Sequence, residues 1–198
     1  KTNPNLQGEL IMGLFDKFKK FDNKQDVCKK NLTTGSGMWG LWDYDTYKEI
    51  DNYEKWEKLF CEDNDIKKQI EKNRFVPIYI FEDGCRSFTL KIDSELSDRE
   101  QKYVCVKSEP YLFYSNGKII LSGIECINKE VSEQDAIILE VLKGFYQVTI
   151  YLLSWDEEPN AYLKDGTINP NALSDFVVIL KSNADENKKY RLRVNTFS

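Results

Sequence analysis

The sequence predicts a mainly β protein: a β-sandwich, or a curved antiparallel sheet of about nine strands, with two or three short helices in its N-terminal third. From residue 75 onward, apolar and polar residues alternate with period two in successive short runs, as in strands that bury one face. Aromatic residues make up 13% of the chain, a generous share that suits a sheet-rich core. The clearest run lies within Asp135–Trp155, where one face of the second strand carries Tyr146, Val148, Ile150 and Leu152.

The first 36 residues differ from the rest and divide into two segments. Residues 1–11 are expected to be a translated leader without function, because the segment from Met12 resembles a bacterial N-terminus and Gln7-Gly8-Glu9 can be encoded by a ribosome-binding sequence. Residues 12–36 are expected to form an amphipathic helix over Met12–Phe21 and then a linker, as Asp22–Gly37 is mostly polar. Residues 37–198 then form a single β-rich domain.

The β-rich domain begins with one strand and two helices. Met38–Tyr44 carries two tryptophans and is expected to be a strand. Asp45-Thr46 offers an N-cap for a helix over Tyr47–Phe60, and Asn64-Asp65 can cap a further short helix.

The remaining strands are expected to pair mainly as hairpins. Turn signals are Glu82-Asp83-Gly84, Asn116-Gly117 and Lys143-Gly144, each between two runs of β-formers. A long loop, Asp156–Ser174, precedes a last apolar strand at Phe176–Leu180, with which Tyr190–Val194 can pair. The predicted strands around these turns are 75–81, 88–92, 103–107, 111–114, 118–122, 137–141 and 145–153.

The residues available for catalysis are few. The chain has no histidine, which removes the usual general base, zinc imidazole ligands and histidine-activated nucleophiles. Its five cysteines are scattered without C-x-x-C spacing and are expected to be free and mostly buried, and Cys85 is only a weak candidate nucleophile. Neither a catalytic constellation nor a metal or cofactor motif is evident, so we expect a non-enzymatic protein without a cofactor.

Charge is concentrated in one segment. Between Asp43 and Asp65 there are nine acidic and three basic residues, interleaved with aromatic residues. This pattern favours either a helix with a solvated charged face or an acidic, aromatic surface for a basic protein partner. The candidate partner-binding residues are Asp43, Asp45, Tyr47, Glu49, Asp51, Glu54, Glu57 and Asp63.

Other partners are disfavoured. The sequence pI of about 5.0 and the lack of a basic stripe argue against nucleic-acid binding. No apolar run approaches the roughly 20 residues that span a bilayer, and no secretory signal is visible, so a cytoplasmic location without stable membrane insertion is expected.

Two stretches resemble a known group of proteins. Gly117–Ile124 fits the strand pattern G-x-[ILV]-x-[ILV]-x-[GS]-I, and Val141–Ile150 fits the pattern [LV]-x-x-G-x-Y-x-[VL]-x-[VI]. Over about Phe75–Trp155 the chain is similar to small bacterial sandwich proteins related to the competence nuclease inhibitor and to immunity proteins of polymorphic toxin systems. The resemblance implies inhibition of a toxin or nuclease, and it carries no functional residue across because the matching positions are scaffold positions.

The leading hypothesis is therefore a bacterial immunity or inhibitor protein that binds a basic toxin or nuclease. The alternative is a sandwich that binds a small ligand or carbohydrate, with tryptophans as stacking platforms. The candidate platforms are Trp39, Trp42 and Trp155.

Overall fold

A computed structural model describes residues 27–197, and it confirms the mainly β class. Within that range ten strands form two sheets, and all strand pairs are antiparallel except β4 with β10. Sheet A has the order β1-β4-β10-β9-β5, with β6 also paired to β9; sheet B has the order β3-β2-β7-β8. The strands of sheet A are β1 (Val27–Thr34), β4 (Gly84–Ile92), β5 (Val104–Lys107), β6 (Tyr111–Ser115), β9 (Gly144–Leu153) and β10 (Phe176–Ser182). Those of sheet B are β2 (Met38–Asp43), β3 (Phe75–Tyr79), β7 (Lys118–Gly123) and β8 (Ala136–Glu140).

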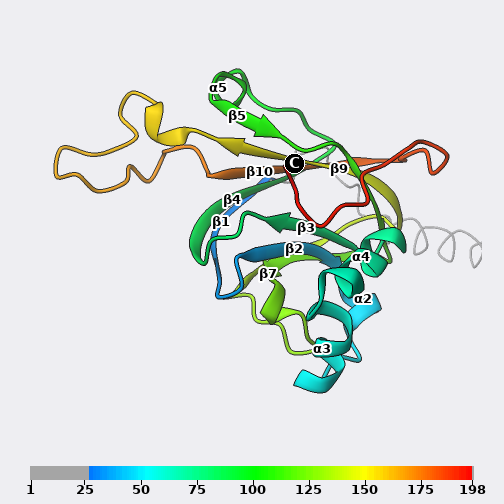
Figure 1. Cartoon of the computed structure of the whole chain (residues 1–198). Helices are drawn as coiled ribbons and strands as arrows, with labels where there is room; N and C mark the ends of the chain where they lie inside the picture. The colour runs from blue at the N-terminus through cyan, green and yellow to red at the C-terminus, as the bar shows by residue number, and fades with distance from the viewer. Residues whose placement is uncertain (1–26, 198) are drawn as a thin grey trace, which may run out of the picture.

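The core lies between the two sheets, which Figure 1 shows one above the other. Trp39 of β2 is fully buried, with its ring centroid 5.5 Å from that of Phe88 on β4 and 6.3 Å from that of Phe176 on β10. Burial of each such side chain contributes roughly 2–3 kcal/mol. Gly40 permits the close approach of β3, because a Cβ there would lie 2.0 Å from the Phe75 ring. The alternation of apolar and polar residues in the sequence therefore arises because each strand buries one face in the core between the two sheets.

The three predicted hairpins are wrong, although their strands exist. Each turn leads from one sheet to the other, so β3 and β4, β6 and β7, and β8 and β9 are not paired. At the turn after β6 only Gly117 has a positive φ, 129°, whereas a type I′ hairpin turn requires positive φ at both central residues. Asn116 instead directs its backbone N–H and its side chain to Asp43. Period-two runs identify strands. They do not show whether two successive strands are neighbours in one sheet or lie in different sheets that face each other.

Both ends of the described chain also depart from expectation. The predicted linker contains β1, which pairs with β4 along eight residues. Its inward positions include only one large aliphatic side chain, Leu32, so its apolar signal is weak. Residues 190–194 do not pair with β10; Arg191 donates its backbone N–H to the carbonyl of Pro110, just before β6. The predicted leader 1–11 and the helix over 12–21 lie outside the described residues.

The helices are shorter than predicted and one was missed. The helix expected over 47–60 is two helices, α2 (Tyr44–Tyr47) and α3 (Tyr53–Phe60), separated by buried Ile50, and their N-caps are Asp43 and Asn52 rather than Asp45-Thr46. The next helix, α4, runs over Asp63–Glu71 from an N-cap at Glu62. Helix α5 (Asp98–Lys102) lies outside the N-terminal third to which helices had been assigned.

Two further expectations concern the thiols and the membrane. All five cysteines are free, but three are exposed and none is buried, so the expectation of mostly buried thiols is wrong. Burial raises the pKa of the half-buried Cys126 thiol to about 11. Among the described helices none has the length and apolar character needed to cross a bilayer.

Candidate protein-binding site

Two of the eight predicted partner-binding residues, Asp43 and Tyr47, are buried in the core and so cannot contact a partner. Tyr47 is 2% exposed, packs its ring edge against Trp42 and Phe60, and donates its hydroxyl to Gln69 Oε1 at 3.3 Å. Burial raises the pKa of this hydroxyl well above its ordinary value. Asp43 is fully buried. Neither side chain is available to a partner.

Asp43 has a structural function as a hydrogen-bond acceptor, which its position in the acidic segment does not indicate. Its carboxylate caps α2 by accepting the backbone N–H of Thr46 at 3.1 Å, and it accepts the backbone N–H of Asn116 at 2.6 Å. It also accepts hydrogen bonds from the side chains of Thr46, Ser115 and Asn116. We call residues 44–60, which contain α2 and α3, the helical end. The Asp43 carboxylate thus ties the helical end to the turn between β6 and β7.

The other six predicted residues are exposed, and their charges differ in how far they are neutralised. Lys48 pairs with Asp45 at 3.0 Å and Lys55 pairs with Asp51 at 2.9 Å. Such exposed pairs contribute about 0–1 kcal/mol to stability and partly offset the local charge. Within residues 27–197, no ion pair involves the remaining four, which are Glu49, Glu54, Glu57 and Asp63.

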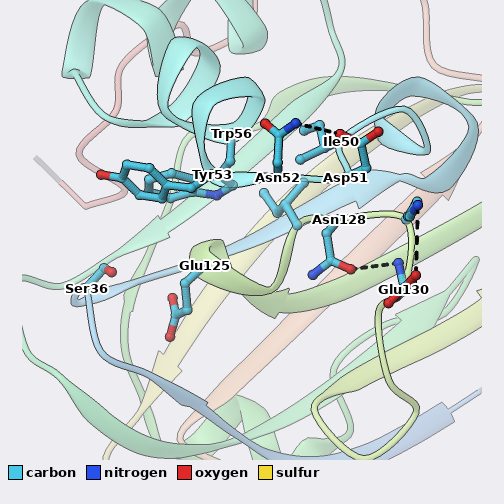
Figure 2. Close-up of a pocket in the computed structure, with 11 residues that line it drawn as sticks. Ser36, Ile50, Asp51, Asn52, Tyr53, Trp56, Glu125, Asn128 and Glu130 are labelled. Atoms are coloured by element: carbon cyan, nitrogen blue, oxygen red, sulfur yellow. Dashed lines mark hydrogen bonds and ion pairs between the residues drawn. The ribbon is translucent and has the colours of Figure 1, made fainter.

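A groove opens beside this acidic surface. It has a volume of about 770 Å³ and lies between the residues around the start of α3 and the irregular segment that follows β7. Figure 2 shows Tyr53, Asn52 and Asp51 along one wall, with Glu125, Asn128 and Glu130 opposite and Ser36 near one end. We call it the acidic groove; Ile50, Trp56, Ile127 and Lys129 complete its lining.

Hydrogen bonds between the two walls fix the shape of the acidic groove. The Lys129 backbone N–H donates to the Ile50 carbonyl at 2.9 Å, and the Trp56 indole N–H donates to the Ile124 carbonyl at 2.8 Å. Tyr44 adds a third link by donating its hydroxyl to the Lys129 carbonyl at 3.2 Å. The groove is therefore preformed, which lowers the entropic cost of binding.

The groove combines negative charge with aromatic surface. Its lining includes three carboxylates, from Asp51, Glu125 and Glu130, and one lysine. Tyr53 is 64% exposed, and its ring stacks on Trp56 with a centroid separation of 5.7 Å. The nearby carboxylate of Glu57 raises the pKa of the Tyr53 hydroxyl, as expected in a region of negative potential.

Sequence reasoning found one wall of the groove and missed the other. Asp51 was predicted, whereas Glu125 and Glu130 lie some 70 residues further along the chain. They reach the groove because β7 pairs antiparallel with β2, which places Gly123 opposite Trp39 at the start of β2, and because the chain after β2 folds back along the segment after β7, where Ile50 and Trp56 form hydrogen bonds with it. That pairing is a tertiary contact, and residues 124–130 alone contain no pattern that predicts it.

The long loop 156–174, which we call the arm, extends from the sandwich on another side (yellow to orange in Figure 1). It is internally bonded: Leu163 donates its backbone N–H to Thr167 and Asn169 donates to Ala161, both at 2.8 Å. Three large apolar side chains near its tip are exposed, those of Tyr162, Leu163 and Ile168.

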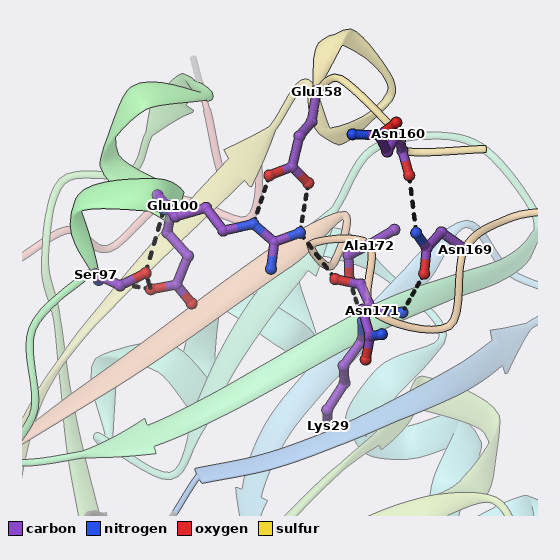
Figure 3. A network of polar contacts seen from close by, with 9 residues as sticks. Lys29, Ser97, Glu100, Glu158, Asn160, Asn169, Asn171 and Ala172 are labelled. Carbon is purple, nitrogen blue, oxygen red and sulfur yellow. Dashed lines mark hydrogen bonds and ion pairs between the residues drawn. The ribbon is translucent and has the colours of Figure 1, made fainter. Parts of the chain in front are cut away.

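The base of the arm is held by helix α5, as Figure 3 shows. Arg99 forms a two-pronged ion pair with Glu158 and donates to the carbonyl of Asn171 at 2.8 Å. The hydrogen bonds from Arg99 lower the pKa of Glu158. Lys29 of β1 donates to the carbonyl of Ala172. Arg99 thus matches the charge of Glu158 at the arm's base.

The tryptophan platform of the alternative hypothesis is not assembled. Trp39 and Trp42 are both 0% exposed, so neither can stack on a ligand. Trp155 is half-buried, donates its indole N–H to Asp175 Oδ1 at 3.0 Å and contacts the Tyr162 ring. The three side chains do not form a common surface.

Comparisons with known proteins bear on the fold. Neither the protein-family models nor the curated proteins that were searched include a match. Among solved structures, a protein described as crocagin biosynthetic gene J matches with a TM-score of 0.53 and 15% identity, over 81% of this chain and 99% of that one. ComJ from Bacillus subtilis, an inhibitor of the DNA-degrading activity of NucA, matches with a TM-score of 0.47 and 10% identity, over 80% of this chain and 98% of its own. At 15% identity, the match to the crocagin protein shows a likeness of fold alone.

Proposed function

We propose that this chain is a non-enzymatic inhibitor, of the immunity-protein type, that binds a basic toxin or nuclease through its acidic helical end. The observation that carries the proposal is the acidic groove, a preformed concave surface where three carboxylates and an exposed tyrosine meet. Exposed aromatic side chains beside complementary charge are typical of protein-binding hot spots.

The charges around the groove support a basic partner. Glu49, Glu54 and Glu57 are exposed on the same helical end and form no ion pair within residues 27–197, so they add negative charge beyond the lining of the groove. A nuclease presents a basic surface to its substrate, and opposite potentials speed the encounter of two proteins. The buried Asp43 accepts hydrogen bonds within the fold on both carboxylate oxygens, which favours a structural over a catalytic function for it.

The test is capture and protection. The tagged full chain is expected to co-purify with a basic protein encoded beside its gene, to block that protein's toxicity on co-expression, and to bind it more slowly as salt rises. A chain that captures none of these proteins and protects cells from none of them would contradict the proposal.

A further inference from the structure

We infer that the acidic groove seats an arginine side chain of the partner, with the guanidinium between the Tyr53–Trp56 ring pair and the Glu125 carboxylate. This inference rests on the proposed function, because it names the partner group that the groove receives. It names as the specific contact Glu125, which lies outside the acidic segment, together with the aromatic pair Tyr53 and Trp56.

The ring pair provides one side of the proposed site. The planes of Tyr53 and Trp56 are stacked at 26°, and the Trp56 indole is held by its hydrogen bond to the Ile124 carbonyl. A flat guanidinium can lie on such a face and gain both cation–π attraction and contact area, at a smaller dehydration cost than an ammonium group.

Glu125 provides the other side. Its carboxylate accepts the Gly35 backbone N–H at 2.7 Å and the Thr34 hydroxyl at 3.0 Å, one on each oxygen. Both donors are neutral, so they fix the carboxylate in place and leave its charge unmatched. A carboxylate has about four acceptor positions, so two remain for the paired N–H groups of a guanidinium.

The groove also has a shape that suits a side chain delivered from outside. Its volume is about 770 Å³, and two of its carboxylates, Asp51 and Glu130, are paired with Lys55 and Lys129, so Glu125 is the carboxylate of the lining without an ion pair within residues 27–197. Lysine would gain the charge attraction but not the planar stacking or the paired hydrogen bonds. The geometry therefore favours arginine over lysine.

Two blocked peptides test this selectivity: acetyl-Gly-Arg-Gly-amide and acetyl-Gly-Lys-Gly-amide, titrated into the ¹⁵N-labelled full chain. The chain has four tryptophans, and the indole signal of Trp56 is identified with Trp56→Phe. We expect the arginine peptide to shift this signal and to bind at least about fivefold more tightly than the lysine peptide. Tyr53→Ala and Glu125→Gln should each weaken binding by about fivefold or more, whereas Glu140→Gln, an exposed carboxylate on β8 outside the groove, should not.

Equal binding of the two peptides, no shift of the Trp56 signal, or full binding by Glu125→Gln would overturn the inference. Unchanged signals elsewhere in the Tyr53→Ala and Glu125→Gln spectra establish that the variants are folded. If the arginine peptide fails while the chain still captures and neutralises a basic protein, the groove inference falls and the proposed function stands. If the peptide binds as expected but no protein is captured, the proposed function falls instead.

Discussion

The acidic groove and the arm are two ordered surface features with opposite properties. The groove is concave and carries carboxylates that exceed its one lysine, with Tyr53 exposed above it. The arm projects from the sandwich, Arg99 matches the charge of Glu158 at its base, and its exposed side chains are both apolar and charged. Glu125 in the groove has no ion pair within residues 27–197 and can meet a cation of a partner, whereas Glu158 is already paired with Arg99 and holds the arm in place.

Each feature depends on a different buried carboxylate. Asp43 ties α2 to the β6–β7 turn at the helical end. Glu100 holds α5 against sheet A through an ion pair with Lys91 at 2.5 Å and through the capping box with Ser97. A substitution at Asp43 or at Glu100 should therefore destabilise the helical end or the base of the arm separately.

The largest effect is expected for Asp43→Ala. Removal of this carboxylate leaves the part-buried backbone N–H groups of Thr46 and Asn116 without this acceptor, so the free energy of unfolding should fall by about 3 kcal/mol. Hydrogen exchange should quicken at the helical end and not in the arm. Asp45→Ala, an exposed neighbour, should cost about 0.5 kcal/mol or less in urea unfolding. Equal losses for the two variants would show that Asp43 does not hold this end together.

Glu100→Gln should have the next largest effect, about 2 kcal/mol, because Lys91 is left buried without its counter-charge. Urea unfolding checks this value, with Glu95→Gln as the control, since the Glu95 carboxylate is exposed and pairs with Lys181 at the surface. Hydrogen exchange should quicken around α5 and the base of the arm while the groove stays protected.

The same variant predicts a change in acid sensitivity. Burial favours the neutral form of Glu100, but the hydrogen bonds from Lys91 and Ser97 outweigh it and hold the pKa below its ordinary value of 4.5. The folded state thus binds this proton less readily than the unfolded state, so the stabilisation is complete above that value and is lost as pH falls through the lowered pKa. Glu100→Gln should remove this part of the acid dependence; an unchanged acid profile would contradict the assignment.

The smallest effect is expected for Arg99→Ala. Its ion pair with Glu158 is exposed, so the free energy of unfolding should fall by about 1 kcal/mol or less. Limited proteolysis should nevertheless cut the arm faster, because its base loses three hydrogen bonds, while Arg86→Ala, which removes another surface pair, should leave the arm resistant. Slower or equal cleavage in Arg99→Ala would mean that the arm is held by other contacts.

The sequence predicts strands well here and their partners poorly, for a physical reason. Period-two alternation reports which face of a strand is buried, and it is the same for two strands side by side and two strands facing each other across a core. The Asn116-Gly117 pair was misleading because Asn116 donates hydrogen bonds to Asp43 instead of forming a type I′ hairpin turn. Helix α5 could have been found, since Ser97 and Glu100 have the spacing of a capping box.

The candidate site was predictable only in part. The excess of acid between Asp43 and Asp65 directed attention to the helical end, but composition cannot separate the buried Asp43 and Tyr47 from the exposed Asp51. Glu125 enters the site through the pairing of β2 with β7, which local patterns do not report.

The most direct test of the central claim is protection by two charge-reversed variants of the full chain. One reverses the helical end with Glu49→Lys, Glu54→Lys and Glu57→Lys. The other reverses the arm with Asp156→Lys, Glu157→Lys and Asp165→Lys, three acidic residues that are also exposed. Both are compared with the unaltered chain against the basic protein that it captures. We predict that helical-end reversal abolishes protection and slows association by about tenfold or more, and that arm reversal leaves both within about twofold. Loss of protection on arm reversal with full protection after helical-end reversal would contradict the account.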